Sequence, residues 1–544
     1  MHGQRVLRIA WAAIPLAVLV VFFFYPVAGM LGRGLWPQGV FAPADFIASL
    51  SGGRVGRVVW FTLWSSATAT MLAVLLGVPV AFVLHRLRFP GQGLLQAVVF
   101  VPFVMPTIVV GIAFRRLLME GGLLGGLGLD GSPGAIVAAM VFFNISVVVR
   151  SVGAFWADLD PRRGQAAMSL GASPLQVFTT ITLPALLPAI VAAAGVVFLF
   201  CATAFGIVLI LGGLRYANLE TEIYLLTTTQ LDLTAAAALS VLQLTVLFLL
   251  LTLTYVVRRD RAPVERHQEH LSKVSWRQWP VLLLTAFVLA FLLLPLVSMG
   301  VSSLRREGAW TLANYAGLLT TGVGDVLLTS PVSASITSLI TAFTASAMAL
   351  SLGMIVAVLV TRRHPTRAGR RIAAVFDGIF MLPLGVSAVT VGFGLLITVY
   401  GPPMSLGGSW WLVPIAQSLV ALPLVVRAMA PVLSSIDDRQ LQAAAALGAS
   451  PSRVLLSVEL PLAWRSLVGA FGFAFAVSLG EFGATSFLVR QGNPTLPVVI
   501  YQLLGRREPE NFTIALAAAV LLAATTTTVI LAAQRLRPST VGVR

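Results

Sequence analysis

Long apolar runs separated by short polar segments make up almost the whole chain. Twelve runs are long enough to cross a membrane, because about 20 apolar residues span its hydrocarbon layer. The pattern predicts transmembrane helices near residues 10–32, 59–84, 96–114, 135–157, 186–212, 233–257, 279–302, 335–360, 372–400, 410–435, 466–489 and 512–534. The first run, Ile9 to Leu31, is longer than the apolar part of a signal peptide, so we expect a retained helix.

Two of the polar segments are copies of each other. Residues 165–184 read QAAMSLGASPLQVFTTITLP and residues 442–461 read QAAAALGASPSRVLLSVELP, without a gap between the two alignments. The likeness extends to other matched positions, some after a small shift: Arg150 with Arg427, Gly206 with Gly483, Gly77 with Gly353, Arg86 with Arg362, and Gly111 with Gly392. Self-similarity of this kind indicates a duplication.

The duplication predicts two six-helix units, residues 1–257 and 279–544, joined by a linker at residues 258–278. Because six is an even number, both units cross the membrane in the same orientation. We therefore expect an all-α polytopic membrane protein with two parallel repeats related by an axis along the membrane normal. The solute path is expected to lie on that axis.

Composition and charge agree with a membrane protein and indicate its orientation. The chain is 58% hydrophobic and 10% charged, far from the roughly 25% charged residues of soluble proteins. Arg and Lys are roughly twice as frequent on the side that carries both termini and the linker, which places that side in the cytoplasm. The net charge of +16 is thus explained without nucleic acid. The single cysteine, Cys201, excludes an intrachain disulfide.

The copied segments lie between the fourth and fifth predicted spans of each half, on the cytoplasmic side. A glycine in each copy, Gly171 or Gly448, suits a sharp turn that a Cβ would obstruct. The pairs Ser173-Pro174 and Ser450-Pro451 suit an N-cap and the first residue of a following helix. Two interpretations of this helix–turn–helix stay open: a docking element for a cytoplasmic partner, or an interfacial helix that only completes the fold.

The spacing within both copies resembles that of permease subunits of bacterial binding-protein-dependent ABC importers. Their pattern is Glu-Ala-Ala-x-x-x-Gly, then nine residues, then Ile-x-Leu-Pro. This chain has Gln165 and Gln442 in place of the acidic residue and Val458 in place of isoleucine. Two such loops in one chain resemble the fused permeases of thiamine and ferric-iron importers.

The resemblance implies the type I importer permease fold and a set of partners. In that family two cytoplasmic ATPase subunits bind the loops, and an extracytoplasmic solute-binding protein delivers the solute. The chain would then lie in the bilayer of the cytoplasmic (inner) membrane with both termini in the cytoplasm. The loop residues that the resemblance implicates in ATPase binding are Gln165, Ala166, Ala167, Gly171, Ser173, Pro174, Gln442, Ala443, Ala444, Gly448, Ser450 and Pro451.

The chain is not expected to be an enzyme or to hold a cofactor or metal of its own. A P-loop needs a lysine that reaches the nucleotide phosphates, and the only lysine, Lys273, is not in a glycine-rich loop. ATP and Mg would be bound by the partner subunits. Several runs, among them Val141–Asn144 and Thr221–Tyr224, are more similar to thiamine permeases than to iron permeases. Thiamine is therefore the predicted solute, with ferric iron as the alternative.

Four residues within the spans are candidates for the solute pathway. Glu481 is an ionisable group inside a predicted span, which marks a functional candidate, and its counterpart in the first half is Ala204. Phe205 and Phe482 suit stacking on a planar cation, and equally suit packing between helices. Asn144 lies in the middle of a span and needs a partner within the bundle. A structural role is the alternative for each residue.

A different class of protein shares the predicted symmetry. An ion-coupled secondary transporter with two parallel six-helix halves would carry several intramembrane carboxylates or histidines, and would have no need of duplicated docking loops. This sequence has few such groups and does have the loops. We therefore keep this class as the more distant alternative.

Overall fold

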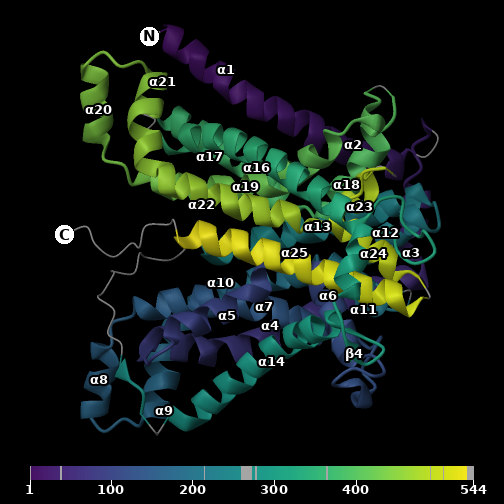
Figure 1. The fold of residues 1–544 in the computed structure, drawn as a ribbon. Coiled ribbons are helices and arrows are strands. Elements are labelled where there is room, and N and C mark those ends of the chain that lie inside the picture. Colours follow the sequence, from purple (N-terminus) through teal and green to yellow (C-terminus); the bar gives the residue numbers. More distant parts are fainter. Residues whose placement is uncertain are drawn as a thin grey trace. The chain divides into compact units, whose positions relative to one another are not determined.

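The computed structural model describes residues 2–36, 39–213, 215–258, 272–275, 278–362, 366–402, 404–489, 492–506 and 508–535. Within these ranges the chain is almost entirely helical (Figure 1). Nine of the described helices are long and apolar enough to cross a membrane, and a bent pair of helices adds a tenth. Two shorter apolar helices, Leu233–Leu249 and Ala388–Thr398, lie at the positions of further predicted spans.

All twelve predicted spans fall on helices, as the hydropathy pattern indicated. In the first half they are α1–η1–α2 (His2–Leu19, Val20–Phe24, Tyr25–Leu35), α4 (Gly53–Arg86), α5–α6 (Gln92–Val104, Thr107–Leu118), α7 (Pro133–Ala157), α10–α11 (Leu183–Ala202, Phe205–Gly212) and α13 (Leu233–Arg258). In the second half they are α14 (Trp279–Ser303), α16 (Pro331–Thr361), α17–α18 (Arg367–Met381, Ala388–Thr398), α19 (Leu412–Ser434), α22–α23 (Leu460–Leu479, Thr485–Leu488) and α25 (Pro509–Arg535).

Short elements connect the spans. Among them are the helices α3 (Pro43–Ser51), α12 (Leu219–Thr228), α15 (Ala313–Ala316) and α24 (Leu496–Leu504). Strand β1 (Leu87–Arg88) pairs in parallel with β2 (Ser272–Lys273), with Leu87 opposite Ser272. Strands β3 (Arg305–Arg306) and β4 (Ala309–Trp310) form an antiparallel hairpin. Most of the predicted linker at residues 258–278 lies outside the described residues.

The helices pack into two compact units, and each unit contains the opening span of the other repeat. One unit comprises residues 1–46, 226–241 and 312–544, and the other comprises residues 47–225 and 242–311. In the first of these, α1 packs on α16 and α2 packs on α18. In the second, α14 packs on α4 and α6. The boundaries predicted at 257 and 279 therefore remain boundaries of the sequence repeat and do not coincide with those of the packed units.

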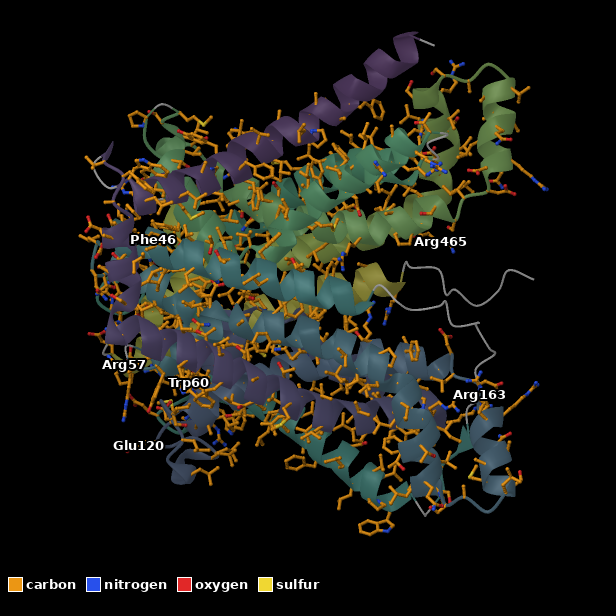
Figure 2. The ribbon with its side chains drawn as sticks, turned by 180° about the vertical axis from the view of Figure 1, so that it is seen from behind. Phe46, Arg57, Trp60, Glu120, Arg163 and Arg465 are labelled. Carbon is orange, nitrogen blue, oxygen red and sulfur yellow. The ribbon has the colours of Figure 1, made fainter. Side chains whose placement is uncertain are left out.

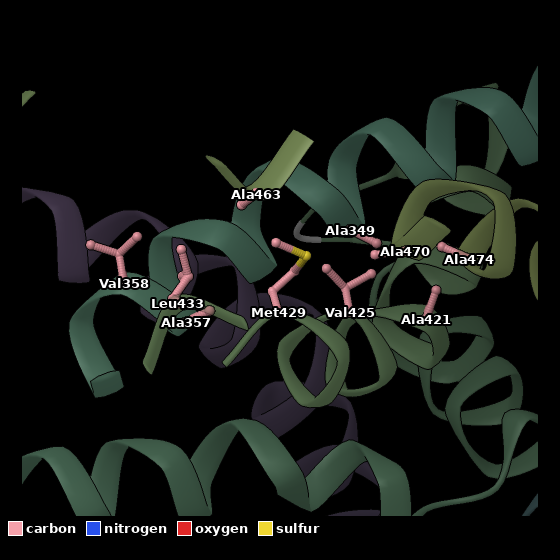
Figure 3. Packing of buried hydrophobic residues seen from close by; sticks show 10 residues of the cluster. All are labelled: Ala349, Ala357, Val358, Ala421, Val425, Met429, Leu433, Ala463, Ala470 and Ala474. Atoms are coloured by element: carbon pink, nitrogen blue, oxygen red, sulfur yellow. The ribbon is translucent and has the colours of Figure 1, made fainter. Parts of the chain in front are cut away.

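Small side chains allow the helices to approach closely. The cluster drawn in Figure 3 lies on α16, α19 and α22, and six of its ten members are alanines. Without a hydrophobic driving force between helices in lipid, small residues favour association by bringing backbones into contact. Large apolar side chains face outward on the same helices and others, for example Phe343 and Phe287, which are 59% and 60% exposed. Small side chains between the helices and large apolar side chains on the outer surface are what a lipid environment favours.

Charged residues lie at both ends of the compact unit that comprises residues 47–225 and 242–311. Figure 2 shows Arg57 and Glu120 at one end and Arg163 at the other. The first pair belongs to the predicted extracytoplasmic side and Arg163 to the predicted cytoplasmic side. The separation agrees with the predicted alternation of the spans.

Candidate functional sites: paired loops and broken helices

The two copied segments fold into the same exposed helix–turn–helix. The first consists of α8 (Arg162–Ser169) and α9 (Pro174–Val177), and the second of α20 (Asp438–Ala446) and α21 (Pro451–Val454). In Figure 1 each pair extends from the end of its own unit. We call residues 162–177 the first docking loop and residues 438–454 the second docking loop.

The sharp turn predicted at the glycines is present in both loops. Gly171 has a φ of 90° and Gly448 a φ of 85°, in the left-handed region that favours glycine. The N–H of Ala172 donates to the carbonyl of Ala167 over 3.1 Å, and the N–H of Ala449 donates to the carbonyl of Ala444 over 3.1 Å. These are the hydrogen bonds of a Schellman motif, which ends α8 and α20 in the same way.

The serines cap the helices that follow. The Ser173 hydroxyl accepts from the N–H of Gln176, while the Gln176 side chain accepts from the N–H of Ser173, at 3.2 Å and 2.8 Å. This is a capping box. In the second loop the Ser450 hydroxyl accepts from the N–H of Arg453 at 3.4 Å. Pro174 and Pro451 are the first helical residues, as predicted.

Each loop leads into its fifth span through a π-helical segment. The segments are η4 (Phe178–Thr182) and η9 (Leu455–Glu459), at matched positions of the two halves. Single π-helical turns are rare in proteins, and those that do occur are often found at functional sites. The likeness of the halves therefore extends to an unusual backbone geometry, beyond the residues that are identical.

The loops expose apolar side chains at matched positions. Leu170 and Leu447 are both 89% exposed, and Leu175 is 71% exposed. The implicated residues Gln165, Ala166, Gln442 and Ala443 are exposed, whereas Ala167 and Ala444 are half-buried. The two loops therefore present an apolar side chain at the same position of their turn.

The third and fifth spans of both halves are broken helices. The third span of the first half bends by 103° between α5 and α6, and that of the second half is interrupted between α17 and α18. The fifth spans are interrupted between α10 and α11 and between α22 and α23. Broken backbone at membrane depth leaves polar groups that need partners, and it is tolerated only where it is buried in protein or lines a cavity.

The broken spans contact each other through the matched glycines. In the first half, a Cβ on Gly206 would lie 2.6 Å from Thr107 Oγ1, and one on Gly111 would lie 2.9 Å from Ile210 Cβ. In the second half, a Cβ on Gly392 would lie 2.6 Å from the Cα of Ala484. Only glycine therefore permits this approach, and the sequence repeat had already paired Gly111 with Gly392 and Gly206 with Gly483.

The two halves satisfy the broken backbone of the fifth span differently. In the second half the carboxylate of Glu481 accepts from the N–H groups of Ala484 and Thr485, at 2.7 Å and 3.0 Å. In the first half the amide of Asn218 donates to the carbonyl of Ala204 at 3.2 Å. Sequence reasoning did not single out Asn218. The available signal was an asparagine close after the predicted fifth span.

The other pathway candidates adjoin the break of the fifth span in their own half. Phe205 lies 5.2 Å from the ring of Tyr224, and Phe482 lies 5.6 Å from Tyr501, between ring centroids. Both phenylalanines are buried. The amide nitrogen of Asn144 donates to the carbonyl of Met140 and to the sulfur of Cys201, at 2.9 Å and 3.3 Å.

Asn144 also carries a polar atom that its surroundings do not satisfy. Its Oδ1 is buried and has no hydrogen-bond partner among the residues that the structure describes. Asn144 and Phe205 belong to one compact unit, whereas Glu481 and Phe482 belong to the other. The structure thus brings each pair to one broken helix, and the pathway role of the four residues remains a prediction.

Comparison with known proteins matches both halves of the chain to one family. The family model described as "Binding-protein-dependent transport system inner membrane component" matches residues 73–261 and again residues 349–541. Each match contains one docking loop. The duplication inferred from the sequence is therefore confirmed.

Individual relatives have the length of either the whole chain or one half. The "Probable ABC transporter permease protein y4fN" of Sinorhizobium fredii is 26% identical and covers 97% of this chain and 95% of that protein. The "Thiamine transport system permease protein ThiP" of Brucella abortus is 26% identical over 82% of each chain. The "Molybdenum transport system permease protein ModB" of Mycobacterium tuberculosis is 31% identical over 43% of this chain and 88% of its own.

Proposed function

The chain belongs to the family of binding-protein-dependent transport system inner membrane components, and from this premise we propose that it carries thiamine inward as the permease of an ABC importer. It is a multi-pass inner-membrane protein in which one polypeptide contains two permease repeats. The proposal concerns the solute, the partners and the orientation. The observation that carries it is the pair of matched, exposed docking loops.

Two cytoplasmic ATPase subunits bind the docking loops, one subunit to each. The loops share a Schellman turn, a proline-started second helix and a leucine that is 89% exposed. A short amphipathic helix seated in a groove is a common recognition mode, in which apolar side chains anchor the contact. Leu170 and Leu447 are such anchors. ATP and Mg bound by the partners then supply the energy that this chain has no motif to capture.

The docking loops and both termini face the cytoplasm, and a solute-binding protein delivers thiamine to the opposite face. The excess of Arg and Lys on the loop side supports this orientation. ATP binding draws the ATPases together and shifts the chain between two arrangements of its helices. A partner can drive such a shift only through its different affinity for the two arrangements.

Thiamine is proposed as the solute because relatives that match 82% and 85% of this chain are thiamine permeases and because the second half carries a buried carboxylate at a broken helix. Thiamine is a cation with a planar ring system, and Glu481, Phe482 and Phe205 are the groups that we assign to its passage. Asn144 is assigned to the same pathway, since its Oδ1 has no hydrogen-bond partner among the residues that the structure describes and can accept one.

The test is uptake of labelled solutes by cells with and without the intact gene. Deletion is expected to abolish high-affinity, ATP-dependent uptake of thiamine, and expression of the chain is expected to restore it. Ferric iron and molybdate serve as the parallel solutes. Loss of ferric or molybdate uptake with normal thiamine uptake would overturn the solute. Uptake that survives ATP depletion and stops when the proton or sodium gradient is removed would overturn the importer mechanism.

A further inference from the structure

An arginine at the loop end of the second span contacts the chain beside the docking loop in each half. Arg86 is the last residue of α4, and Arg362 directly follows α16. The two positions are matched by the sequence repeat. Neither arginine lies in a docking loop, and the family resemblance does not involve them.

Arg86 holds the chain where it enters the first docking loop. Its Nη1 donates to the carbonyls of Trp156 and Leu159, at 3.3 Å and 3.1 Å. Trp156 lies in the last turn of α7 (Pro133–Ala157) and Leu159 lies two residues beyond its end, where carbonyls lack the helical donors of the helix interior. A cation at a helix C-terminus satisfies such carbonyls and complements the helix dipole. The guanidinium therefore ties the second span to the start of the loop.

Arg362 holds the chain where it leaves the second docking loop. Its Nη2 lies 3.1 Å from Oε1 of Glu459, whose side chain is only 6% exposed. Glu459 is the last residue of the π-helical segment η9. Thr182 takes its place in the first half. Arg86 therefore contacts the chain before its loop, and Arg362 contacts the chain after its loop.

These contacts give each loop a lateral attachment. The apical residues of both loops are exposed, so a force applied there reaches the bundle through the two chain ends. The arginines add a direct path to the second spans, which pack along the fourth spans as α4 on α7 and α16 on α19. The ion pair with Arg362 also attaches the last residue of the π-helical segment η9 to the end of α16.

We propose that Arg86 and Arg362 are positioning residues that transmit movement of each docking loop to the second span of the same half. The inference rests on the proposed function, because it assumes that ATPases bind the loops. Loss of either contact should leave ATPase binding and ATP hydrolysis in place and reduce the solute moved per ATP.

The test uses the chain reconstituted in proteoliposomes with its ATPase subunits and solute-binding protein, with labelled thiamine as the solute. Arg362→Glu and Glu459→Arg should each lower the thiamine transported per ATP hydrolysed by roughly tenfold, a usual size for coupling between two sites. The double variant should restore the ratio, because the ion pair is re-formed with its charges exchanged. Arg86→Leu should lower the ratio as well, and Arg86→Lys should retain part of it.

Arg371→Glu is the matched control, because it makes the same charge change at an exposed position of α17 in the same unit. It should leave the ratio unchanged. If Arg362→Glu does not fold, Arg362→Gln and the double variant carry the test. An unchanged ratio in the single variants, or a double variant that is not restored, would overturn the inference. A wild-type complex that lacks ATPase subunits or ATP-driven uptake would instead overturn the proposed function.

Discussion

Glu481 has a structural role that any functional role must accommodate. Both of its carboxylate oxygens accept backbone N–H groups at the start of α23, so its charge stabilises the broken helix. Hydrogen bonds to charged groups contribute about 1.5–3 kcal/mol each. A carboxylate held in this way is also fixed in position, which is what a binding group for a passing cation requires.

Glu481→Gln separates these roles. The amide has one oxygen to accept a backbone N–H, so we expect a loss of about 1.5–3 kcal/mol of stability, measured as a lower midpoint of thermal unfolding in detergent. Transport by the protein that folds should fall because the charge is gone. The appropriate control is Ser478→Ala, which lies one turn away and removes no charge. If folded Glu481→Gln protein transports thiamine at the normal rate and KM, the pathway role is wrong and the residue is a helix cap.

The turn glycines allow a second prediction for single residues. Among the described residues no heavy atom lies within 4 Å of where a Cβ would stand at Gly171 or Gly448. A substitution there is therefore opposed only by the left-handed backbone, which costs roughly 1–2 kcal/mol for most side chains.

Gly171→Val and Gly448→Val should disrupt the loops and reduce copurification of the ATPase subunits, while the membrane helices remain folded. Gly171→Asn and Gly448→Asn are the matched controls, because asparagine tolerates the left-handed region. Binding that survives in the valine variants would show that the loop conformation is not what the ATPase recognises.

At the scale of elements, the broken third and fifth spans of each half approach each other closely. A Cβ at Gly392 would collide with the backbone of Ala484 in the neighbouring span, and backbone atoms cannot move aside as a flexible side chain does. Gly392→Ala should therefore destabilise the protein by about 1–3 kcal/mol, as overpacking usually does.

Gly378→Ala is the control for that prediction, because it lies on α17 in the same predicted span and, among the described residues, has no heavy atom within 4 Å of the added Cβ. Alanine stabilises a helix relative to glycine, so this variant should unfold at the same temperature as wild type or slightly higher. Equal thermal stability of the two variants would mean that the broken spans are not tightly packed.

At the scale of the whole molecule, the membrane orientation is open to direct measurement. Cys201 is the single cysteine and its matched residue is Ser478, so Cys201→Ser provides a cysteine-free background. In that background Leu170→Cys and Leu447→Cys should react with an impermeant maleimide only in inverted membrane vesicles. Trp310→Cys, at an exposed position of the β3–β4 hairpin, should react in intact spheroplasts. Labelling of either loop from the outside would reverse the proposed orientation.

The sequence by itself determined the features that depend on neighbouring residues or on periodicity. Apolar runs locate the spans because the bilayer thickness sets their length. The loop turns follow from glycine, serine and proline at fixed spacing, and the duplication follows from direct self-comparison. Self-comparison also matched Gly111 with Gly392 and Gly206 with Gly483. It did not show that these glycines lie where the broken spans meet.

Only the tertiary structure decided which spans pack together and how the broken backbone is satisfied. Hydropathy shows only that a segment is apolar enough to cross the membrane, so it does not encode that α2 packs on α18 or α14 on α4. The contacts of Arg362 with Glu459 and of Asn218 with Ala204 join residues that are separated along the chain or across a break. Such contacts depend on three-dimensional proximity, which the order of residues along a membrane helix does not reveal.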